Sequence, residues 1–285
     1  MKRAINNILM FLVDSARFVY FLLNLVVTKS FSNPISKNCG GTVAVLANGP
    51  SLNEVMPCLT VDDEFKNIDF VAMNYFAFDN IFFSIKPKHY CLADPMFFKE
   101  DHRIDAVRKL FGILQNDVDW NLCIYVPHHF AGRFAQFSGI TNEKISVIIV
   151  HCVDFRGYES FRNFFYRKGV STPGIYNVTN LAIYAAINSG YSKIMLYGVD
   201  HTFFDIRVDE QNRLCSRATH FYDDGKATYK PIINRKGEVE KVSQYLKFLA
   251  GLFKSHDHLS AYAKYMNVEI INCTFCSLID SYIRK

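Results

Sequence analysis

The chain has 285 residues, of which half are apolar and 15% aromatic, so it can bury a sizeable core in one large domain or two small ones. Its net charge of +5 is mild and diffuse, which suits contact with anionic lipid or phosphorylated substrates and argues against nucleic acid as a partner. The eight cysteines are scattered, and the single Cys-x-x-Cys pair, Cys273 and Cys276, lacks the further ligands of a zinc site. Free thiols fit a reducing cytoplasm.

Residues 5–27 form a long apolar segment that contains a few polar side chains. Its length would cross a bilayer, but Asp14 and Arg17 are costly at mid-membrane. On a helix the polar residues share one narrow face; they are Arg3, Asn6, Asn7, Asp14, Arg17 and Asn24. This pattern predicts a helix that lies in the membrane surface, and the alternative is a helix packed on the protein's own core or on a partner subunit. With the linker at 30–38, residues 1–38 form a membrane-associating unit before a domain over 39–285.

The next stretch, Val43-Ala-Val-Leu-Ala-Asn48-Gly49-Pro50-Ser51-Leu52, reads as a buried strand that enters a tight turn. Asn48 and Gly49 allow the turn, and Pro50 suits the first turn of a helix. Ser51 adds a hydroxyl beside amide donors, an arrangement that attracts phosphate. The stretch therefore predicts a phosphate-type binding turn, with an ordinary βα turn as the alternative.

Strands and helices alternate along the rest of the chain. We expect strands at 69–72, 89–93, 122–126, 146–150, 193–197 and 268–271, and helices at 101–114, 179–189, 242–253 and 259–266. This order predicts an α/β fold, a Rossmann-like, mainly parallel sheet flanked by helices. Polar residues follow the strands, where such sheets bind ligands; they are Asn48, Asn74, Asp94, His128, His151 and Asp200. Residues 205–241 are polar and show little periodicity. With the preceding residues from 201, they are predicted to form a lid-like excursion (201–241) from the domain.

Asp117-Val-Asp119 matches the metal-binding motif Asp-x-Asp. It precedes the strand at 122–126, however, and so lies at the amino end of the sheet, whereas ligands bind at the carboxyl end. We therefore predict no metal and no cofactor. Gly-x-Ser-x-Gly, a Walker lysine and Gly-x-Gly-x-x-Gly do not occur in the sequence, which weakens hydrolase, kinase and dehydrogenase assignments.

Several short motifs, in order, resemble those of the bacterial sialyltransferases of glycosyltransferase family 42. They are Asn48-Gly-Pro-Ser-Leu52, Asn74, Asp94-Pro-Met-Phe-Phe98, Thr172-Pro173-Gly174, Gly190-Tyr-Ser-Lys-Ile-Met-Leu-Tyr-Gly-Val-Asp200, His220-Phe-Tyr222 and Asn272-Cys-Thr-Phe-Cys-Ser277-Leu. The resemblance covers about residues 42–280 and excludes the N-terminal helix. An Asp stands at 94 where the family has Asn, and His201-Thr-Phe-Phe204 replaces a loop with phosphate-binding tyrosines.

The resemblance implies a GT-A-like fold and transfer of sialic acid from CMP-sialic acid, with inversion and without a metal. It assigns donor binding to Asn48, Gly49, Pro50, Ser51, Asn74, Asp94, Thr172, Pro173, Gly174, Asp200 and Ser277. A catalytic base is needed for the acceptor hydroxyl, and it is His220 in the lid, with His201 as the rival. Tyr222, Arg207 or Arg217 would supply the donor to the leaving phosphate.

The sequence thus predicts a membrane-associated bacterial glycosyltransferase at the cytoplasmic face of the inner membrane. Its acceptor would be a surface glycan on a lipid carrier, lipooligosaccharide, O-antigen or capsule. Alternative donors are CMP-Kdo, another nonulosonic acid or a UDP-hexose. Two other classes stay open: a non-catalytic nucleotide- or glycan-binding subunit of an assembly complex, and a pterin-type pyrophosphokinase that shares only the opening motif. The oligomeric state, including a homo-oligomer, is also open.

Overall fold

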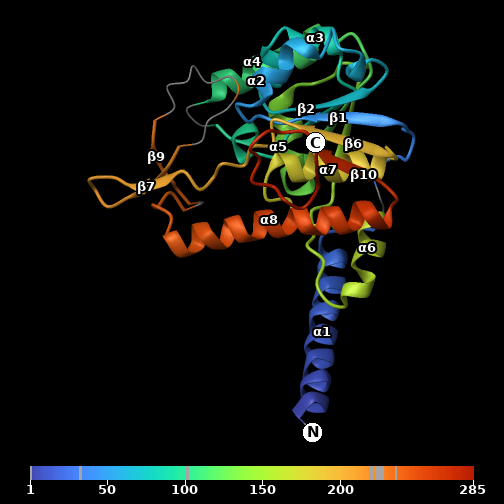
Figure 1. Cartoon of the computed structure of the whole chain (residues 1–285), viewed down its shortest axis with the longest axis vertical. Helices are drawn as coiled ribbons and strands as arrows, with labels where there is room; N and C mark the ends of the chain where they lie inside the picture. Colours follow the sequence, from blue (N-terminus) through green and yellow to red (C-terminus); the bar gives the residue numbers. More distant parts are fainter. Residues whose placement is uncertain (1, 32–33, 101–102, 218–220, 222–227, 235) are drawn as a thin grey trace.

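The computed structural model describes residues 2–31, 34–100, 103–217, 221, 228–234 and 236–285. These residues form an α/β fold around a parallel sheet of eight strands, which confirms the predicted fold class. The strand order is β11-β10-β6-β1-β2-β3-β4-β5, and helices cover both faces of the sheet (Figure 1). Strand β1 lies at the centre of the sheet, between β6 and β2.

The elements have the following bounds. The strands of the large sheet are β1 (Thr42–Leu46), β2 (Asp69–Met73), β3 (His89–Cys91), β4 (Leu122–Pro127), β5 (Ile145–Val150), β6 (Lys193–Tyr197), β10 (Glu269–Asn272) and β11 (Ile283–Arg284). The helices are α1 (Lys2–Val27), α2 (Leu52–Val55), α3 (Ile81–Ile85), α4 (Ile104–Asp117), α5 (Ala131–Ser138), α6 (Glu159–Arg167), α7 (Val178–Ser189) and α8 (Val242–Tyr265). A separate antiparallel sheet contains β7 (Ile206–Val208), β8 (Leu214–Ser216) and β9 (Lys230–Pro231).

Strand β1 shows why the sheet is buried on both sides. Val43 and Val45 pack with α7 and α8, whereas Ala44 and Leu46 pack on the opposite face with α3 and α4. Successive side chains of a strand point to opposite faces, so an unbroken apolar run requires cover on both. Full burial of each aliphatic side chain contributes about 1.5–3 kcal/mol, which makes this strand a strong anchor for the turn that follows it.

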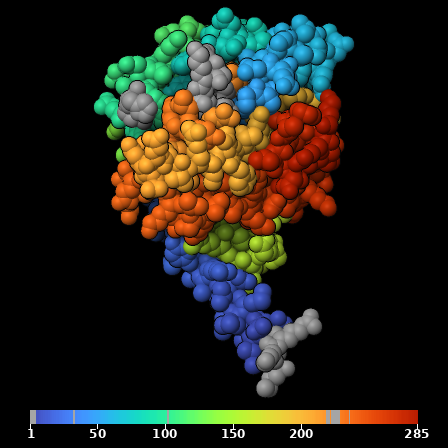
Figure 2. Space-filling view, turned by 60° about the vertical axis from the view of Figure 1, so that its left-hand side comes forward, coloured from blue at the N-terminus to red at the C-terminus, as the bar shows by residue number. Residues whose placement is uncertain are grey.

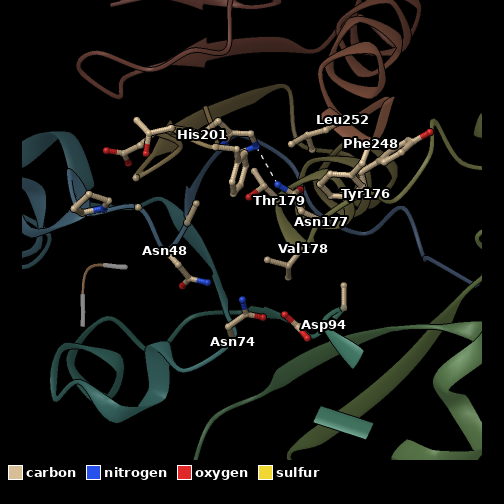
Figure 3. A pocket seen from close by; sticks show the side chains of 18 of the residues that line it. Asn48, Asn74, Asp94, Tyr176, Asn177, Val178, Thr179, His201, Phe248 and Leu252 are labelled. Carbon is tan, nitrogen blue, oxygen red and sulfur yellow. Dashed lines mark hydrogen bonds between the residues drawn. The ribbon is translucent and has the colours of Figure 1, made fainter. Parts of the chain in front are cut away.

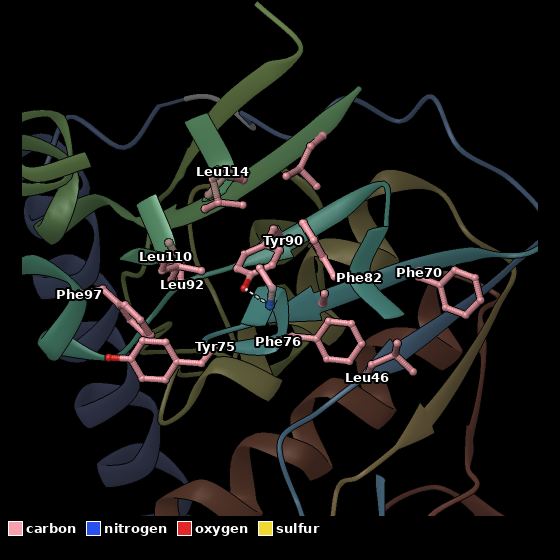
Figure 4. Close-up of a cluster of buried hydrophobic side chains, with 14 of the residues drawn as sticks. Leu46, Phe70, Tyr75, Phe76, Phe82, Tyr90, Leu92, Phe97, Leu110 and Leu114 are labelled. Carbon is pink, nitrogen blue, oxygen red and sulfur yellow. Dashed lines mark hydrogen bonds between the residues drawn. The ribbon is translucent and has the colours of Figure 1, made fainter. Parts of the chain in front are cut away.

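An aromatic cluster between the sheet and α3 and α4 fixes the loop after β2 (Figure 4). Phe76, Phe82 and Tyr90 are fully buried there. The hydroxyl of Tyr90 accepts a hydrogen bond from the backbone N of Ala77, at 3.2 Å, and donates one to the carbonyl of Asn74. The core therefore determines where Asn74 lies.

The structure differs from the sequence prediction at α8, which is one helix where the polar run 254–258 suggested a break. Two residues of that run are buried and hydrogen-bonded. Ser255 Oγ donates to the carbonyl of Gly174, at 2.6 Å, and His256 Nδ1 lies 2.9 Å from the hydroxyl of Tyr282. Buried partners satisfy these polar groups, so the helix continues through them.

Several further elements were not predicted; they are α3, α5, α6, β7, β8, β9 and β11. The polar excursion contains β7, β8 and β9, which have two or three residues each and are too short to show a period-two pattern. Helix α6 has the sequence Glu-Ser-Phe-Arg-Asn-Phe-Phe-Tyr-Arg, and its aromatic residues have only modest helix propensity.

Helix α1 projects from the body (Figures 1 and 2), and its two ends have different surroundings. Near its carboxyl end Phe21 is 1% exposed and packs with Leu25, Val153 and Val170. Toward the other end the apolar side chains are exposed; they are Ile5, Ile8, Leu9, Met10, Phe11, Leu12 and Val13. The segment Ile5–Val27 is long and apolar enough to cross a bilayer. At the carboxyl end only one face packs on the body, because Val19, Leu22, Leu23, Val26 and Val27 are exposed. Packing on the protein's own core, the alternative to membrane contact, therefore holds for one face of one end of the helix.

Candidate functional site

A pocket of about 320 Å³ opens beyond the carboxyl ends of β1, β2, β3 and β6. The chain places β2 to β5 on one side of β1, and later adds β6 and β10 on the other, so the strand order reverses beside β1. Open parallel sheets bind ligands at such a reversal. Eight residues singled out in the sequence line the pocket; they are Asn48, Gly49, Pro50, Asn74, Asp94, Asp200, His201 and Arg217.

Asn48, Asn74 and Asp94, here called the polar wall, come from the ends of three adjacent strands and point toward one another (Figure 3). Asn48 and Asn74 are each 8% exposed, and within the described part of the chain their Oδ1 atoms have no hydrogen-bond partner. Asp94 accepts from the backbone N of Met96 through Oδ1, at 3.0 Å. A buried polar atom without a partner costs about 1–3 kcal/mol, so the polar wall suits a ligand that brings hydroxyl or amine donors.

Asp200 holds the turn after β1. Ser51 donates to this carboxylate from Oγ, at 2.7 Å, and from its backbone N, at 3.3 Å. The backbone N of Gly49 donates to the carbonyl of Gly198, at 2.8 Å, and a Cβ on Gly49 would lie 1.8 Å from Asp200 Oδ2. Helix α2 has only four residues. Amide donors that the sequence suggested for a phosphate are therefore already bonded to groups of the protein itself.

His201 follows β6 on the opposite side of the pocket from the polar wall, and it is 7% exposed. Its Nε2 lies 3.0 Å from Nδ2 of Asn177 and 3.2 Å from Nε2 of His256. Burial lowers the pKa of His256 to about 3, and burial together with the neighbouring His256 lowers the pKa of His201 well below 6.5. Both rings are therefore neutral at pH 7.

Asn177 determines which nitrogen of His201 carries the proton. The side-chain oxygen of Asn177 accepts the backbone N–H of Asn180, at 3.0 Å, and so caps α7. Its Nδ2 is left to donate to His201 Nε2, which assigns the proton of the neutral ring to Nδ1. Because the lone pair on Nε2 is already engaged, His201 is poorly placed to remove a proton from a substrate.

Apolar side chains form the remaining wall of the pocket; they include Tyr176, Phe203, Phe248 and Leu252. The rings of Tyr176 and Phe248 meet edge to face with centroids 5.8 Å apart. Arg217 is the one cation that lines the pocket among the residues described, and its Nε donates to Asp205, at 2.8 Å. The pocket thus combines flat apolar surfaces with polar atoms and a partly neutralised cation.

Phe221, in the excursion, is hydrogen-bonded to the turn after β1. The backbone N of Phe221 donates to the carbonyl of Asn48, at 2.9 Å, and its carbonyl accepts from Asn53 Nδ2, at 3.0 Å. Its side chain is 7% exposed and lies near Phe76. The predicted catalytic residues on either side of it in the sequence, His220 and Tyr222, lie outside the described residues.

The remaining predicted residues lie away from this pocket. Thr172, Pro173 and Gly174 line a second pocket of about 230 Å³. Ser277 lines neither of the two pockets, and its Oγ donates to the carbonyl of Val199, at 2.6 Å. Asp119, which was not assigned to a site from the sequence, forms an exposed ion pair with Lys86, with 2.8 Å between the charged atoms.

Sequence reasoning missed Asn177, His256 and Tyr176. Asn177 had a usable signal, because an amide three residues before Asn180 at the start of a helix fits a capping box. His256 had none, since it belongs to the polar run within α8. Tyr176 is one of many scattered aromatic residues, and only the fold brings it to the pocket.

Comparisons of the chain with protein-family models, with curated protein sequences and with solved structures find no match. Inference about function therefore starts from the geometry of the pocket.

Proposed function

We propose that the protein is a glycosyltransferase that binds a nucleotide-activated sugar in the pocket beside β1. The observation that carries this proposal is the pair of buried, unpartnered oxygens of Asn48 and Asn74 at the reversal of the strand order. The motif order shared with the family 42 sialyltransferases makes CMP-sialic acid the first candidate donor. A surface glycan on a lipid carrier or lipooligosaccharide is the corresponding acceptor.

The chemistry of the pocket suits a nucleoside. Ribose hydroxyls or an exocyclic amine would donate to the oxygens of Asn48 and Asn74, and Asp94 adds a further acceptor. A planar base can lie against the aromatic wall. The volume of about 320 Å³ is at the small end of the range for ligand pockets, about 300–1,000 Å³.

Transfer with inversion would proceed by direct displacement. The acceptor hydroxyl oxygen forms a bond to the anomeric carbon, the bond from that carbon to the phosphate oxygen breaks, and the nucleotide leaves with the electron pair. The hydroxyl proton passes to a base. We assign this role to His220, because the Nε2 lone pair of His201 is engaged by Asn177 and because His220 adjoins Phe221, which is bonded to the Asn48 turn.

A thermal-shift panel of CMP, UDP, GDP and ATP tests the binding step. Ligand at one hundred times its dissociation constant adds about 2.7 kcal/mol of stability, and we expect CMP to raise the melting temperature most. Release of CMP from CMP-sialic acid that depends on added acceptor then tests the transfer step. If only UDP raises the melting temperature, the proposed donor becomes a UDP-hexose. Binding without release favours a non-catalytic subunit, and no response to any nucleotide rejects the site.

We also propose that α1 attaches the enzyme to the cytoplasmic face of the inner membrane. Support comes from its exposed apolar end, whereas Phe21, Leu25 and Ser30 are buried against the body. Deletion of residues 1–13 should shift part of the protein to the soluble fraction with its fold intact, since Val19, Leu22, Leu23, Val26 and Val27 stay exposed. Deletion of residues 1–30 should also remove the packing on Phe155 and Phe165 and lower the melting temperature. A 1–13 deletion that leaves the membrane-bound fraction unchanged contradicts this role.

A further inference from the structure

The second pocket, of about 230 Å³, lies beneath α8, between the loop after β5 and the segment that begins at Thr172. It contains polar groups that the fold does not use. The side chain of Thr172 is fully buried, and its Oγ1 has no hydrogen-bond partner in the described residues. Asp154 also lines the pocket. A buried hydroxyl and a neighbouring carboxylate suit a ligand with sugar hydroxyls, because each can bond such a group.

Cations accompany these groups in the same pocket. Arg156 and Lys254 line it and are exposed, and His258 is half-buried beside them. The Lys254 ammonium is 3.5 Å from Asp257, at the surface, where such a pair is weak and can be exchanged for a stronger anion. An arginine and a lysine together form a usual binding arrangement for a phosphate group.

The position of the pocket relates it to the projecting helix. The Arg156 guanidinium lies over the ring of Tyr20 in α1, 5.2 Å from the ring centre. Phe155, the residue before it, lines the pocket and packs against Phe21 of the same helix. Figures 1 and 2 show α1 and α6 together below α8. The cationic part of the pocket therefore lies next to the apolar helix.

Tyr176 links this pocket to the first one, because it lines both. Its ring lies against Gly251 of α8, where a Cβ would come within 2.4 Å of the ring. Figure 3 shows Tyr176 beside Phe248 and Leu252, at the side of the first pocket away from Asn48. The Tyr176 side chain therefore borders both pockets.

We infer that the second pocket is the acceptor subsite and that it takes a sugar linked through phosphate to a lipid. The lipid chain would lie along α1, the phosphate on Arg156 and Lys254, and the first sugar on Thr172 and Asp154. The free hydroxyl of the acceptor then points past Tyr176 toward the donor. This assignment rests on the proposed function, since an acceptor subsite has meaning only beside a donor pocket.

Farnesyl phosphate is a suitable probe for the full chain in nonionic detergent, with binding measured by calorimetry. We expect farnesyl phosphate to bind at least ten times more tightly than farnesol or inorganic phosphate. The double variant Arg156→Ala/Lys254→Ala should lower its affinity at least tenfold and leave CMP affinity unchanged. Lys264→Ala, an exposed lysine elsewhere on α8, is the matched control and should change neither affinity.

Thr172→Val tests the sugar part of the subsite. The variant keeps the shape of the side chain and removes an unpartnered hydroxyl, so it should fold as well as the original and raise the KM for a farnesyl-phosphate-linked sugar acceptor at least threefold. Its KM for the nucleotide-sugar donor should not change.

Other outcomes would overturn the inference. If farnesol binds as tightly as farnesyl phosphate, the pocket does not recognise the phosphate. If inorganic phosphate binds as tightly as farnesyl phosphate, the pocket is a site for free anions. Competition between CMP-sialic acid and farnesyl phosphate, or a weaker donor affinity in the double variant, makes the second pocket part of the donor site. If CMP does not bind at all, the proposed function fails, and the loss of farnesyl phosphate binding in the double variant still reports on this pocket separately.

Discussion

The first pocket has two sides that differ in how their polar atoms are used. On the polar wall, the oxygens of Asn48 and Asn74 have no partner within the described residues. On the other side, the carboxylate of Asp200 accepts a hydrogen bond from Ser51, which belongs to the turn after β1 but does not line the pocket, and His201 is bonded to Asn177. Bonded groups set the shape of a site, and uncommitted groups recognise what enters it. The predictions below either separate these two kinds of residue or show that the distinction is wrong.

We expect the largest effect from Gly49→Ala, because the new Cβ would lie 1.8 Å from Asp200 Oδ2 and 2.5 Å from the carbonyl of Gly198. Both sides of the pocket would have to move apart. The free energy of unfolding in urea should fall by about 2–4 kcal/mol, and the thermal shift with CMP should disappear. Gly112→Ala is the control, since a Cβ there meets nothing within 4 Å and a helix interior gains about 1 kcal/mol from alanine.

His220→Ala should lower kcat by about 10²–10⁴-fold with donor affinity retained, because general-base help has that size. His201→Gln should keep most of the turnover, since the Nε2 of His201 is engaged by Asn177. The pH profile gives a second readout. A base with the lowered pKa of His201 would stay active well below pH 6.5, so an activity loss near pH 6.5 speaks against His201. Loss of turnover only in the His201 variant would reverse the assignment.

Acid should destabilise the protein through the bonded side of the pocket. The pKa of His256 is lowered to about 3 in the folded protein, against about 6.5 when unfolded, so the unfolded chain binds the extra proton between these values. The stabilising contribution is complete above pH 6.5 and is lost as the pH falls toward 3. Urea unfolding should show up to about 1.4 kcal/mol of lost stability per pH unit from this histidine. His256→Gln should make the slope shallower, and an unchanged slope would show that other groups control it.

Asn48→Ala and Ser51→Ala should give opposite results, although both side chains belong to one turn. Removal of the unpartnered Asn48 oxygen should leave stability unchanged or higher and weaken CMP binding about tenfold, the value of one hydrogen bond. Removal of the Ser51 hydroxyl breaks its bond to Asp200 and should lower stability by about 1.5–3 kcal/mol with little effect on CMP affinity in the folded protein. Calorimetry and urea unfolding of both variants provide the comparison, and equal effects would erase the distinction between the two sides.

Much of the fold could be predicted because its strands are short apolar runs that end in polar residues. The strand at 193–197 matches β6 residue for residue, and the parallel sheet follows from the α/β pattern. Long-range partners could not be predicted. Gly49 suggested a tight turn, but nothing in the sequence pointed to Asp200 as its close neighbour. His201 suggested a base, whereas Asn177 occupies its lone pair. Sequence patterns report burial and local geometry, and hydrogen bonds between distant segments leave no periodic signal.

The bond between Ser51 and Asp200 joins residues separated by 149 positions, which has a consequence for synthesis. At about 5–20 residues per second, the ribosome needs roughly 7–30 s to travel from one to the other. During that time β1 has been synthesised but its neighbour β6 has not. The edge of this apolar strand that will pair with β6 therefore stays unpaired. The turn after β1 cannot form its bond to Asp200 until that residue has left the exit tunnel, and the edge of β1 is open to other chains during this interval.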